Sequence, residues 1–160
     1  GSNTKLASGI APISDFLKDG IPVAIGTDGP SSNNCLDMFR EMFLVTGLAK
    51  LKEQDAAAVD AGEVLKMATV NGAKAMGLYD SDVLAEIKHA DLIRIDLRQP
   101  NMQPIHNIQK NLVYSGSKQN VLMTMIHGKI LYEDGIFYTK DQPEAIYRGV
   151  EKTLERILEK

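Results

Sequence analysis

The sequence predicts an α/β fold: one strand of a β/α barrel or doubly wound sheet with its helices, followed by a small β-rich module. Residues 9–78 alternate between helical periodicity and a single short apolar run, which indicates helix, strand and helix in turn. From residue 84 onward the pattern changes to short strands separated by turn residues. One parallel strand cannot form a sheet, so we expect its neighbours to come from elsewhere.

In the first half, a short helix is expected at residues 11–19, where apolar side chains recur on one side. Residues 21–26, Ile-Pro-Val-Ala-Ile-Gly, form an apolar run typical of a parallel strand that is buried on both faces. A loop of turn-forming residues follows at 27–34. The next helix is predicted to reach about Lys52, with Asn34 as its N-cap.

In the second half, a helix rich in small residues is expected at 62–77. Three strands are predicted next, at residues 90–96, 111–114 and 121–126. Two hairpin turns, at residues 127–129 and 133–135, lead into short strands at 130–132 and 136–138. A closing helix at 142–158 is expected to bury four apolar side chains at helical spacing, which are Ile146, Val150, Leu154 and Ile157.

Composition excludes several classes of partner. The 18 Lys and Arg residues against 21 Asp and Glu give a formal net charge of -3, which offers no electrostatic reason to expect nucleic acid or an anionic membrane as partner. No apolar run approaches the roughly 20 residues that span a bilayer, and the first residues lack the apolar core of a signal peptide. The single cysteine, Cys35, excludes an internal disulfide. We therefore expect a soluble, cytoplasmic protein.

Asp28 is the strongest candidate for chemistry. It follows the end of the predicted parallel strand, where β/α barrels and open α/β sheets place their catalytic groups. A carboxylate at that place can ligate a metal and accept a proton from water. The alternative is a turn aspartate whose side chain bonds its own loop. On the residues alone this alternative is the stronger one.

The histidines and the cysteine offer weaker candidates. His89, His106 and His127 have neither His-x-His nor His-x-x-x-His spacing, so no local pair can chelate a metal. Each is interpreted as an ordinary surface or turn histidine. Cys35 precedes a helix and could be a reactive thiol, but a small buried residue is the better interpretation.

Several short motifs, in order along nearly the whole chain, resemble the amidohydrolase superfamily. The resemblance is strongest to its 5-methylthioadenosine/S-adenosylhomocysteine deaminases and chlorohydrolase-like enzymes. The motifs are Ser-Asn-Thr-Lys-Leu-Ala-Ser-Gly at 2–9, Gly-Thr-Asp-Gly at 26–29, Ser-Asn-Asn at 32–34, Leu-Asp-Met-Phe at 36–39, Ala-Thr-Val-Asn-Gly-Ala at 68–73, Ala-Asp-Leu-Ile at 90–93, Asn-Leu-Val-Tyr-Ser at 111–115 and Gly-Lys-Ile-Leu at 128–131. One departure is Ile87, which stands where these enzymes often have glycine.

The resemblance implies a (β/α)8 barrel with a flanking β-sandwich, of which this chain is the C-terminal portion. Residues 1–80 would be the last β/α part of the barrel, 81–140 part of the sandwich, and 141–160 the C-terminal helix. In such enzymes one divalent metal, usually zinc, is held by histidines of earlier strands and an aspartate of the eighth strand. Asp28 would be that aspartate, both metal ligand and catalytic residue, and residues 2–9 the preceding loop that faces the active site.

The implied reaction is hydrolytic deamination of an adenosine-type nucleoside, with Asp28 passing a proton from the metal-activated water to the departing amine. The chain lacks the other ligands, so we expect it to be inactive alone and to hold no zinc at that site. Open sheet edges and an uncovered helix predict self-association into a homo-oligomer. Two alternatives stay open: a hydrolase of another amino- or chloro-substituted heterocycle, and a non-catalytic binding domain.

Overall fold

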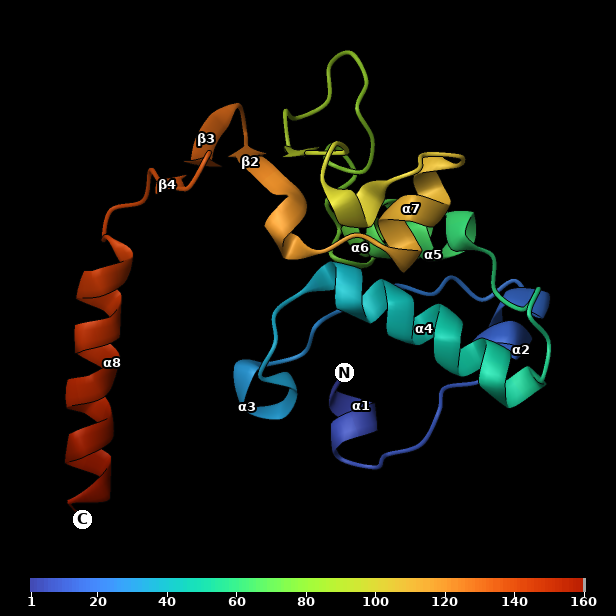
Figure 1. Ribbon diagram of the computed structural model, residues 1–160, viewed down its shortest axis with the longest axis horizontal. Coiled ribbons are helices and arrows are strands. Elements are labelled where there is room, and N and C mark those ends of the chain that lie inside the picture. The colour runs from blue at the N-terminus through green and yellow to red at the C-terminus, as the bar shows by residue number, and fades with distance from the viewer. Residues whose placement is uncertain (160) are drawn as a thin grey trace.

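The protein consists of a helical body, a small antiparallel sheet and a separate C-terminal helix (Figure 1). The computed structural model describes residues 1–159. The helices are α1 Ser2–Lys5, α2 Ile13–Lys18, α3 Pro30–Asn33, α4 Met38–Glu53, α5 Ala61–Ala68, α6 Val70–Ala75, α7 Ile108–Tyr114 and α8 Pro143–Leu158, with 3-10 turns η1 Pro100–Met102 and η2 Lys118–Asn120. The strands are β1 Leu92–Ile95, β2 Val121–Ile126, β3 Lys129–Glu133 and β4 Ile136–Phe137. The predicted mixture of helices and strands is confirmed.

The hydrophobic core lies where α4, α5 and α7 meet. Val64 and Met67 of α5 and Val113 of α7 are fully buried there. Helix α5 begins at a capping aspartate, because Asp60 accepts a hydrogen bond from the backbone N–H of Gly62 at 2.7 Å. These three side chains belong to a cluster of nine buried apolar residues that stabilises the helical body, since apolar burial dominates folding free energy.

The predicted strand at 111–114 is wrong, because these residues belong to α7. The side chain of Asn107 caps this helix by accepting a hydrogen bond from the N–H of Lys110 at 3.0 Å. A short apolar run fits a strand and a buried helix equally well, and here the cap decides for the helix. The predicted helix at 62–77 is present but is divided into α5 and α6 at Thr69, whose backbone leaves the helical conformation.

The predicted N-cap of α4 is also wrong. Asp37 caps the helix, accepting hydrogen bonds from the N–H groups of Phe39 and Arg40 at 3.0 and 3.4 Å. Asn34 instead ends α3 with φ 64°, in the left-handed region that asparagine tolerates better than most residues. Both residues are favoured at helix ends, so the sequence alone could not assign the two roles.

Residues 21–26 are extended but pair with no strand among residues 1–159. Helices hold the segment instead. The N–H of Ile25 donates to the carbonyl of Met67 at 3.1 Å, and the Asn71 amide donates to the carbonyl of Val23 at 2.8 Å. The prediction of burial on both faces is wrong for this chain. Only the side with Val23 and Ile25 packs against the core, because the described residues place nothing over the other side.

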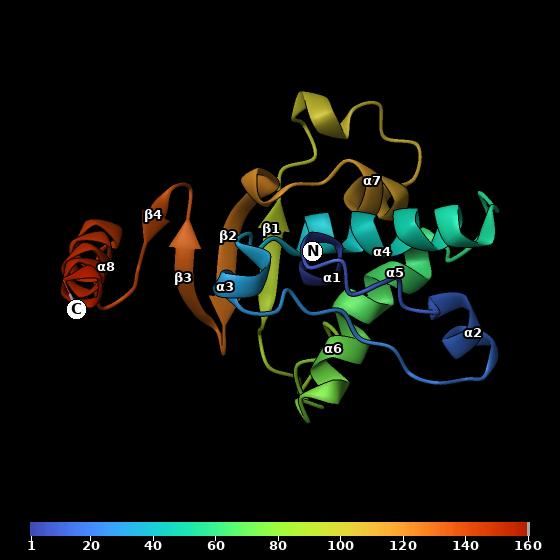
Figure 2. The same cartoon turned by 90° about the horizontal axis from the view of Figure 1, so that it is seen from below.

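The sheet has the order β1-β2-β3-β4 with antiparallel pairing throughout. Strands at 121–126 and 130–132 and both hairpin turns are confirmed. The first turn has positive φ at His127 and Gly128, and the second at Asp134 and Gly135, which is the geometry of tight two-residue hairpins. The strand predicted at 90–96 is shortened to β1, and that predicted at 136–138 to β4. In Figure 2, β1 lies beside the helical body and β4 beside α8.

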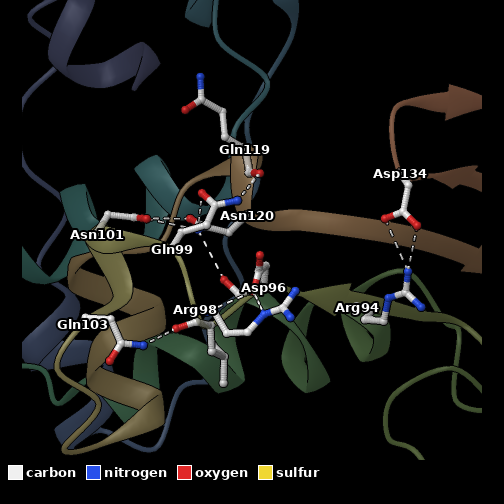
Figure 3. Close-up of polar contacts among 10 residues, drawn as sticks. Arg94, Asp96, Arg98, Gln99, Asn101, Gln103, Gln119, Asn120 and Asp134 are labelled. Carbon is white, nitrogen blue, oxygen red and sulfur yellow. Dashed lines mark hydrogen bonds and ion pairs between the residues drawn. The ribbon is translucent and has the colours of Figure 1, made fainter.

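Asn120 joins the sheet to the helical body (Figure 3). Its side chain is fully buried. The amide nitrogen donates to Gln99 Oε1 at 3.1 Å and to Asn101 Oδ1 at 3.2 Å, and the amide oxygen accepts from Asn101 Nδ2 and from the Ser117 N–H, both at 2.9 Å. Its backbone carbonyl accepts from the N–H of Asp96, just beyond β1, at 2.7 Å. One buried, satisfied amide thus connects the end of β1, η1 and the end of α7.

Ile87 occupies a left-handed conformation with φ 71°, and its side chain is fully exposed. A β-branched side chain is strained at this φ, whereas glycine is not. The glycine expected from the resemblance at this position therefore has a backbone reason, and the isoleucine departs from it at an energetic cost.

Helix α8 stands away from the rest of the molecule (Figure 1). It has no buried residue, and the four side chains predicted to be buried are 51–60% exposed. That prediction is wrong for residues 1–159, because the described part of the chain packs nothing against the apolar side of the helix. Lys160, the last residue of the predicted unit 141–160, lies outside the described residues. No described helix combines the length and apolar character needed to cross a bilayer.

Candidate active site

Asp28 lies at the end of the extended segment that follows α2. Its backbone has φ 61°, and its carboxylate Oδ1 accepts a hydrogen bond from the N–H of Gly29 at 2.7 Å. The predicted turn interaction is therefore present. It engages one carboxylate oxygen with one N–H group, and the residue remains exposed. A metal ligand and a turn residue are consequently compatible roles here.

The extended segment that leads to Asp28 has one side on the core and one side exposed. Val23, Ile25 and Thr27 are partly buried, with Val23 and Ile25 packed on the helical core. Ala24, Gly26 and Asp28 alternate with them and are exposed. Successive side chains of an extended chain point to opposite faces. Ala24 and Gly26 therefore lie on the side away from the core, and Asp28, whose backbone is left-handed, is exposed at the end of the segment.

A cleft of about 340 Å³ lies beside the segment that ends in Asp28. It is lined by the segment 23–28, by residues 1–4 and 9–11, and by one side of α4. Residues 2–9 were expected to face the active site, and part of this segment does line the same cleft as Asp28. It forms the short helix α1 rather than an open loop.

The loop that carries Asp28 is held by two buried polar side chains. Asn33 and Glu41 are only 3% and 5% exposed. The Asn33 amide donates to Glu41 Oε1 at 2.8 Å and to the carbonyl of Thr27, the residue before Asp28. Because the Asn33 amide donates both to a carboxylate oxygen of Glu41 and to the carbonyl of Thr27, the loop between the extended segment and α3 has a defined position.

Sequence reasoning missed this pair. Asn33 is one of several turn-forming residues in the loop, and Glu41 is a charged residue within a predicted helix. In the structure Glu41 is buried while Phe43 of the same helix is 50% exposed. No local signal identified the pair, because its partners are brought together by the turn at α3.

Lys5 ties residues 2–9 to the loop after Asp28. Its ammonium group donates to the carbonyl of Ser31 at 3.2 Å and to the side-chain oxygen of Asn34. These contacts connect residues 2–9, part of which lines the cleft, to the loop after Asp28.

The Asp28 carboxyl is ionised at neutral pH. The neighbouring Ser2 side chain and the backbone N–H of Gly29 hold its pKa below the usual value, with a further contribution from Ser32. These groups favour the charged form because they place positive dipole ends next to it. An ionised carboxylate is the state that ligates a divalent metal.

Asp28 is suited to hold a metal but supplies only one ligand. A four-coordinate zinc site needs three or four protein ligands. Among the described residues, the His, Cys and carboxylate side chains that approach each other closely enough for a metal are His89, Asp91 and His127, and Asp28 is not among them. His106 and Cys35 also lie outside that group. The sequence interpretation of His89 and His127 as isolated residues missed their proximity, which depends on long-range pairing.

Comparison with known proteins decides the family. The model of the amidohydrolase family matches residues 1–131 of this chain. The chain belongs to the amidohydrolase family. The resemblance inferred from its motifs is therefore confirmed.

Individual amidohydrolases agree with this assignment. The 5-methylthioadenosine/S-adenosylhomocysteine deaminase of Dictyoglomus thermophilum is 42% identical over 156 residues, which are 98% of this chain and 37% of the deaminase. A crystal structure of an adenosine deaminase from Xanthomonas campestris with bound zinc has a TM-score of 0.91 at 34% identity, covering 99% of this chain and 36% of that one. Atrazine chlorohydrolase from Arthrobacter aurescens TC1, complexed with zinc, has a TM-score of 0.77 at 25% identity over 94% of this chain and 34% of that one.

The chain thus spans little more than a third of the amidohydrolases that it matches, 37% of the first deaminase and 36% of the second. The unpaired extended segment and the exposed Asp28 carboxylate, which belongs to no group of potential metal ligands among the described residues, fit this partial coverage. Both are features for which the described residues supply no partners.

Proposed function

We propose that this chain is the C-terminal part of a metal-dependent aminohydrolase that deaminates an adenosine-type nucleoside, methylthioadenosine or S-adenosylhomocysteine. The amidohydrolase assignment and the 42% identity to a deaminase of these two compounds support this substrate class. The structural similarity to a zinc-containing adenosine deaminase supports the same chemistry. The chain contributes one wall and one catalytic carboxylate to the active site.

In this proposal, residues 21–26 form the eighth strand of a (β/α)8 barrel. The open sides of the segment would pair with barrel strands that precede residue 1, and the exposed face with Ala24, Gly26 and Asp28 would face the barrel interior. Residues 81–140 would contribute to a flanking β-sandwich and residues 141–160 its accompanying helix. The observation that supports this is the alternation of partly buried and exposed residues along 23–28, because outward-facing barrel residues pack on helices while inward-facing ones line the interior.

Asp28 would hold the metal and move the proton. A divalent metal held there would supply an activated water by lowering its pKa. Asp28 would accept a proton from the attacking water as the water oxygen bonds to the carbon bearing the amino group. The Asp28 carboxyl then delivers the proton to the departing nitrogen, and ammonia leaves. The Gly29 N–H keeps the carboxylate oriented through both transfers, while Asn33 holds the backbone just before it.

The position of Asp28 carries the proposal: an ionised, exposed carboxylate at the end of an extended segment, beside a cleft. A hydrolase of another amino- or chloro-substituted heterocycle would use the same residue, and the similarity to atrazine chlorohydrolase belongs to that reading. The chlorohydrolase is only 25% identical to this chain, whereas the nucleoside deaminase is 42% identical, so the nucleoside is the better supported substrate class. A non-catalytic binding domain would have no use for the open carboxylate.

The test compares this chain with the complete protein in which it occurs. We expect ammonia release from methylthioadenosine by the complete protein and none by residues 1–160 alone, because Asp28 lacks its partner ligands here. The gene upstream of Gly1 should encode a His-x-His strand. Turnover by the isolated chain would contradict the proposal, and a gene that starts at this chain would favour the binding-domain alternative.

A further inference from the structure

A second group of metal-binding side chains lies on the β-rich module, away from Asp28. His89, Asp91 and His127 each present one ligand atom, and these atoms all lie within 4.8 Å of one another. The two imidazole rings have centroids 4.1 Å apart and are tilted by 44°. Asp91 and His127 are 36 positions apart in the chain, so the fold, and not local spacing, brings the group together.

Backbone hydrogen bonds hold the hairpin residue His127 next to His89 and Asp91, which precede β1. The N–H of His127 donates to Asp91 Oδ1 at 2.5 Å, and the N–H of Gly128 donates to the carbonyl of Ala90 at 3.1 Å. These bonds attach the β2–β3 hairpin to the segment that enters β1. On the other side, the N–H of His89 donates to the carbonyl of Asp80 at 2.7 Å. The positions of all three residues are therefore set without any ligand.

Ser81 forms an outer contact of the kind that orients metal-binding histidines. Its hydroxyl oxygen lies 3.3 Å from His89 Nδ1. Ser81 also neighbours the Asp91 carboxylate, and together with the His127 N–H it holds the pKa of Asp91 below its usual value. A proton on Nδ1 of His89, donated to Ser81, leaves the Nε2 lone pair available. Serine, carboxylate and peptide partners of this type fix the tautomer in known metal sites.

The choice of residue at the hairpin turn is unusual. His127 has φ 49° and precedes Gly128 with φ 74°, a turn type for which Asn-Gly and Asp-Gly are strongly preferred. A histidine there adds no turn stability that asparagine would not provide. The nearby cation Lys88 is paired with Asp82 at 2.6 Å, so its charge is balanced within the module.

The donor set identifies the class of ion. Two imidazoles and one carboxylate suit zinc and its neighbours among the divalent transition metals, and not calcium or magnesium, which prefer oxygen ligands. Ligand atoms about 2.1 Å from a tetrahedral ion are roughly 3.4 Å apart. Both histidines are exposed, so small side-chain rotations bring the atoms from within 4.8 Å to that spacing.

We propose that His89, Asp91 and His127 bind one divalent transition-metal ion of the zinc class, with a water in the fourth position. This site is separate from the proposed catalytic metal at Asp28 and does not depend on it. Binding would clip the β2–β3 hairpin to the start of β1, adding a stabilising link to a module that otherwise relies on a few strand hydrogen bonds.

Calorimetric titration of the chain with Zn²⁺ tests the site, using Asp28→Asn as the background so that the other carboxylate cannot contribute. We expect one ion per chain. His89→Gln and His127→Asn should each weaken binding by about tenfold or more, because each removes one ligand. His106→Asn is the matched control and should leave the affinity unchanged. Asparagine at 127 suits the turn, so folding of that variant should be preserved and is checked by circular dichroism.

Copper provides a second readout that a structural role of the histidines would not give. Cu²⁺ added to the Asp28→Asn chain should show electron paramagnetic resonance couplings from two imidazole nitrogens, and these should fall to one in His89→Gln. The proposal is overturned if zinc binds more weakly than about 1 mM. It is also overturned if folded His89→Gln and His127→Asn chains bind zinc as tightly as their parent.

Discussion

The helical body and helix α8 place their apolar side chains in opposite environments. In the body, Val64 and Met67 of α5 are completely buried between α4 and α7. In α8, Leu154 and Ile157 recur on one side at helical spacing but are 55% and 60% exposed. The two helices have similar amphipathic patterns, so a pattern reveals that a face must be covered and not which partner covers it. The same holds for residues 21–28, an apolar segment of which one side is exposed in this chain.

The largest difference should appear on truncating one side chain in each region. Met67→Ala removes a fully buried side chain and should lower the free energy of unfolding by about 2–5 kcal/mol. Leu154→Ala in α8 should change it by less than about 0.5 kcal/mol, because little area leaves the protein interior. Urea unfolding of both variants measures the contrast. At a concentration where the chain is monomeric, equal destabilisation would show that α8 packs against the rest of the same chain, and the two regions would then not differ.

The joint between the helical body and the antiparallel sheet, which Asn120 forms, should be next in sensitivity. Asn120→Ala removes a fully buried amide and leaves polar groups of Gln99 and Asn101 (Figure 3) and the N–H of Ser117 without this partner, so it should destabilise the protein by about 2 kcal/mol. The neighbouring Gln119→Ala, at an exposed position, is the control and should be close to neutral. Hydrogen exchange should show lost protection on both sides of the joint. Loss confined to the sheet would mean that the regions are not coupled there.

The uncovered side of α8 should drive self-association of this chain. Exposed apolar helix faces of this kind are typical interaction surfaces. Leu154→Lys should weaken association by about tenfold, since it places a charge in the apolar side and tenfold corresponds to 1.4 kcal/mol. Glu151→Lys, which leaves the apolar side unchanged, is the matched control. Light scattering at several concentrations gives the mass, and a monodisperse monomer for the unmodified chain would refute the expectation.

The smallest effect is expected at Ile87. Glycine relieves the strain of a β-branched residue at φ 71°, and it removes a fully exposed side chain that makes no packing contribution. We therefore expect Ile87→Gly to raise the free energy of unfolding by about 1 kcal/mol, even though glycine gains more freedom in the unfolded state. Glu86→Gly, one residue earlier, should not stabilise. Thermal unfolding distinguishes the two variants, and a destabilised Ile87→Gly would show that the side chain has a partner in solution.

Local chemistry predicted the elements whose signals are local. The hairpins with Gly128 and Gly135, the strand at 121–126 and the long helix α4 follow directly from turn residues and periodicity. The short apolar run at 111–114 fits a strand as well as a buried helix, and the helix is specified by the cap at Asn107, which lies before the run. Asn34 and Asp37 exchanged their expected roles because both residue types end helices well.

The site was predictable only in part, for a physical reason. Asp28 was identifiable because it follows an apolar run, and the family resemblance gave it a role that the residues alone did not favour. The Asn33–Glu41 pair and the group formed by His89 and His127 depend on contacts between distant segments. Such contacts leave no spacing in the sequence, so only the folded chain reveals them.

The central claim is that Asp28 is a metal ligand and proton carrier of a nucleoside deaminase. It is tested most directly by the rate of ammonia release from methylthioadenosine by the complete protein with Asp28→Asn. We predict a fall in kcat of about 10³-fold, the scale expected when a general acid–base group is lost, with Asp15→Asn on the exposed side of α2 unchanged. If Asp28→Asn keeps a kcat within tenfold of the parent, Asp28 does not carry the proton and the account is wrong.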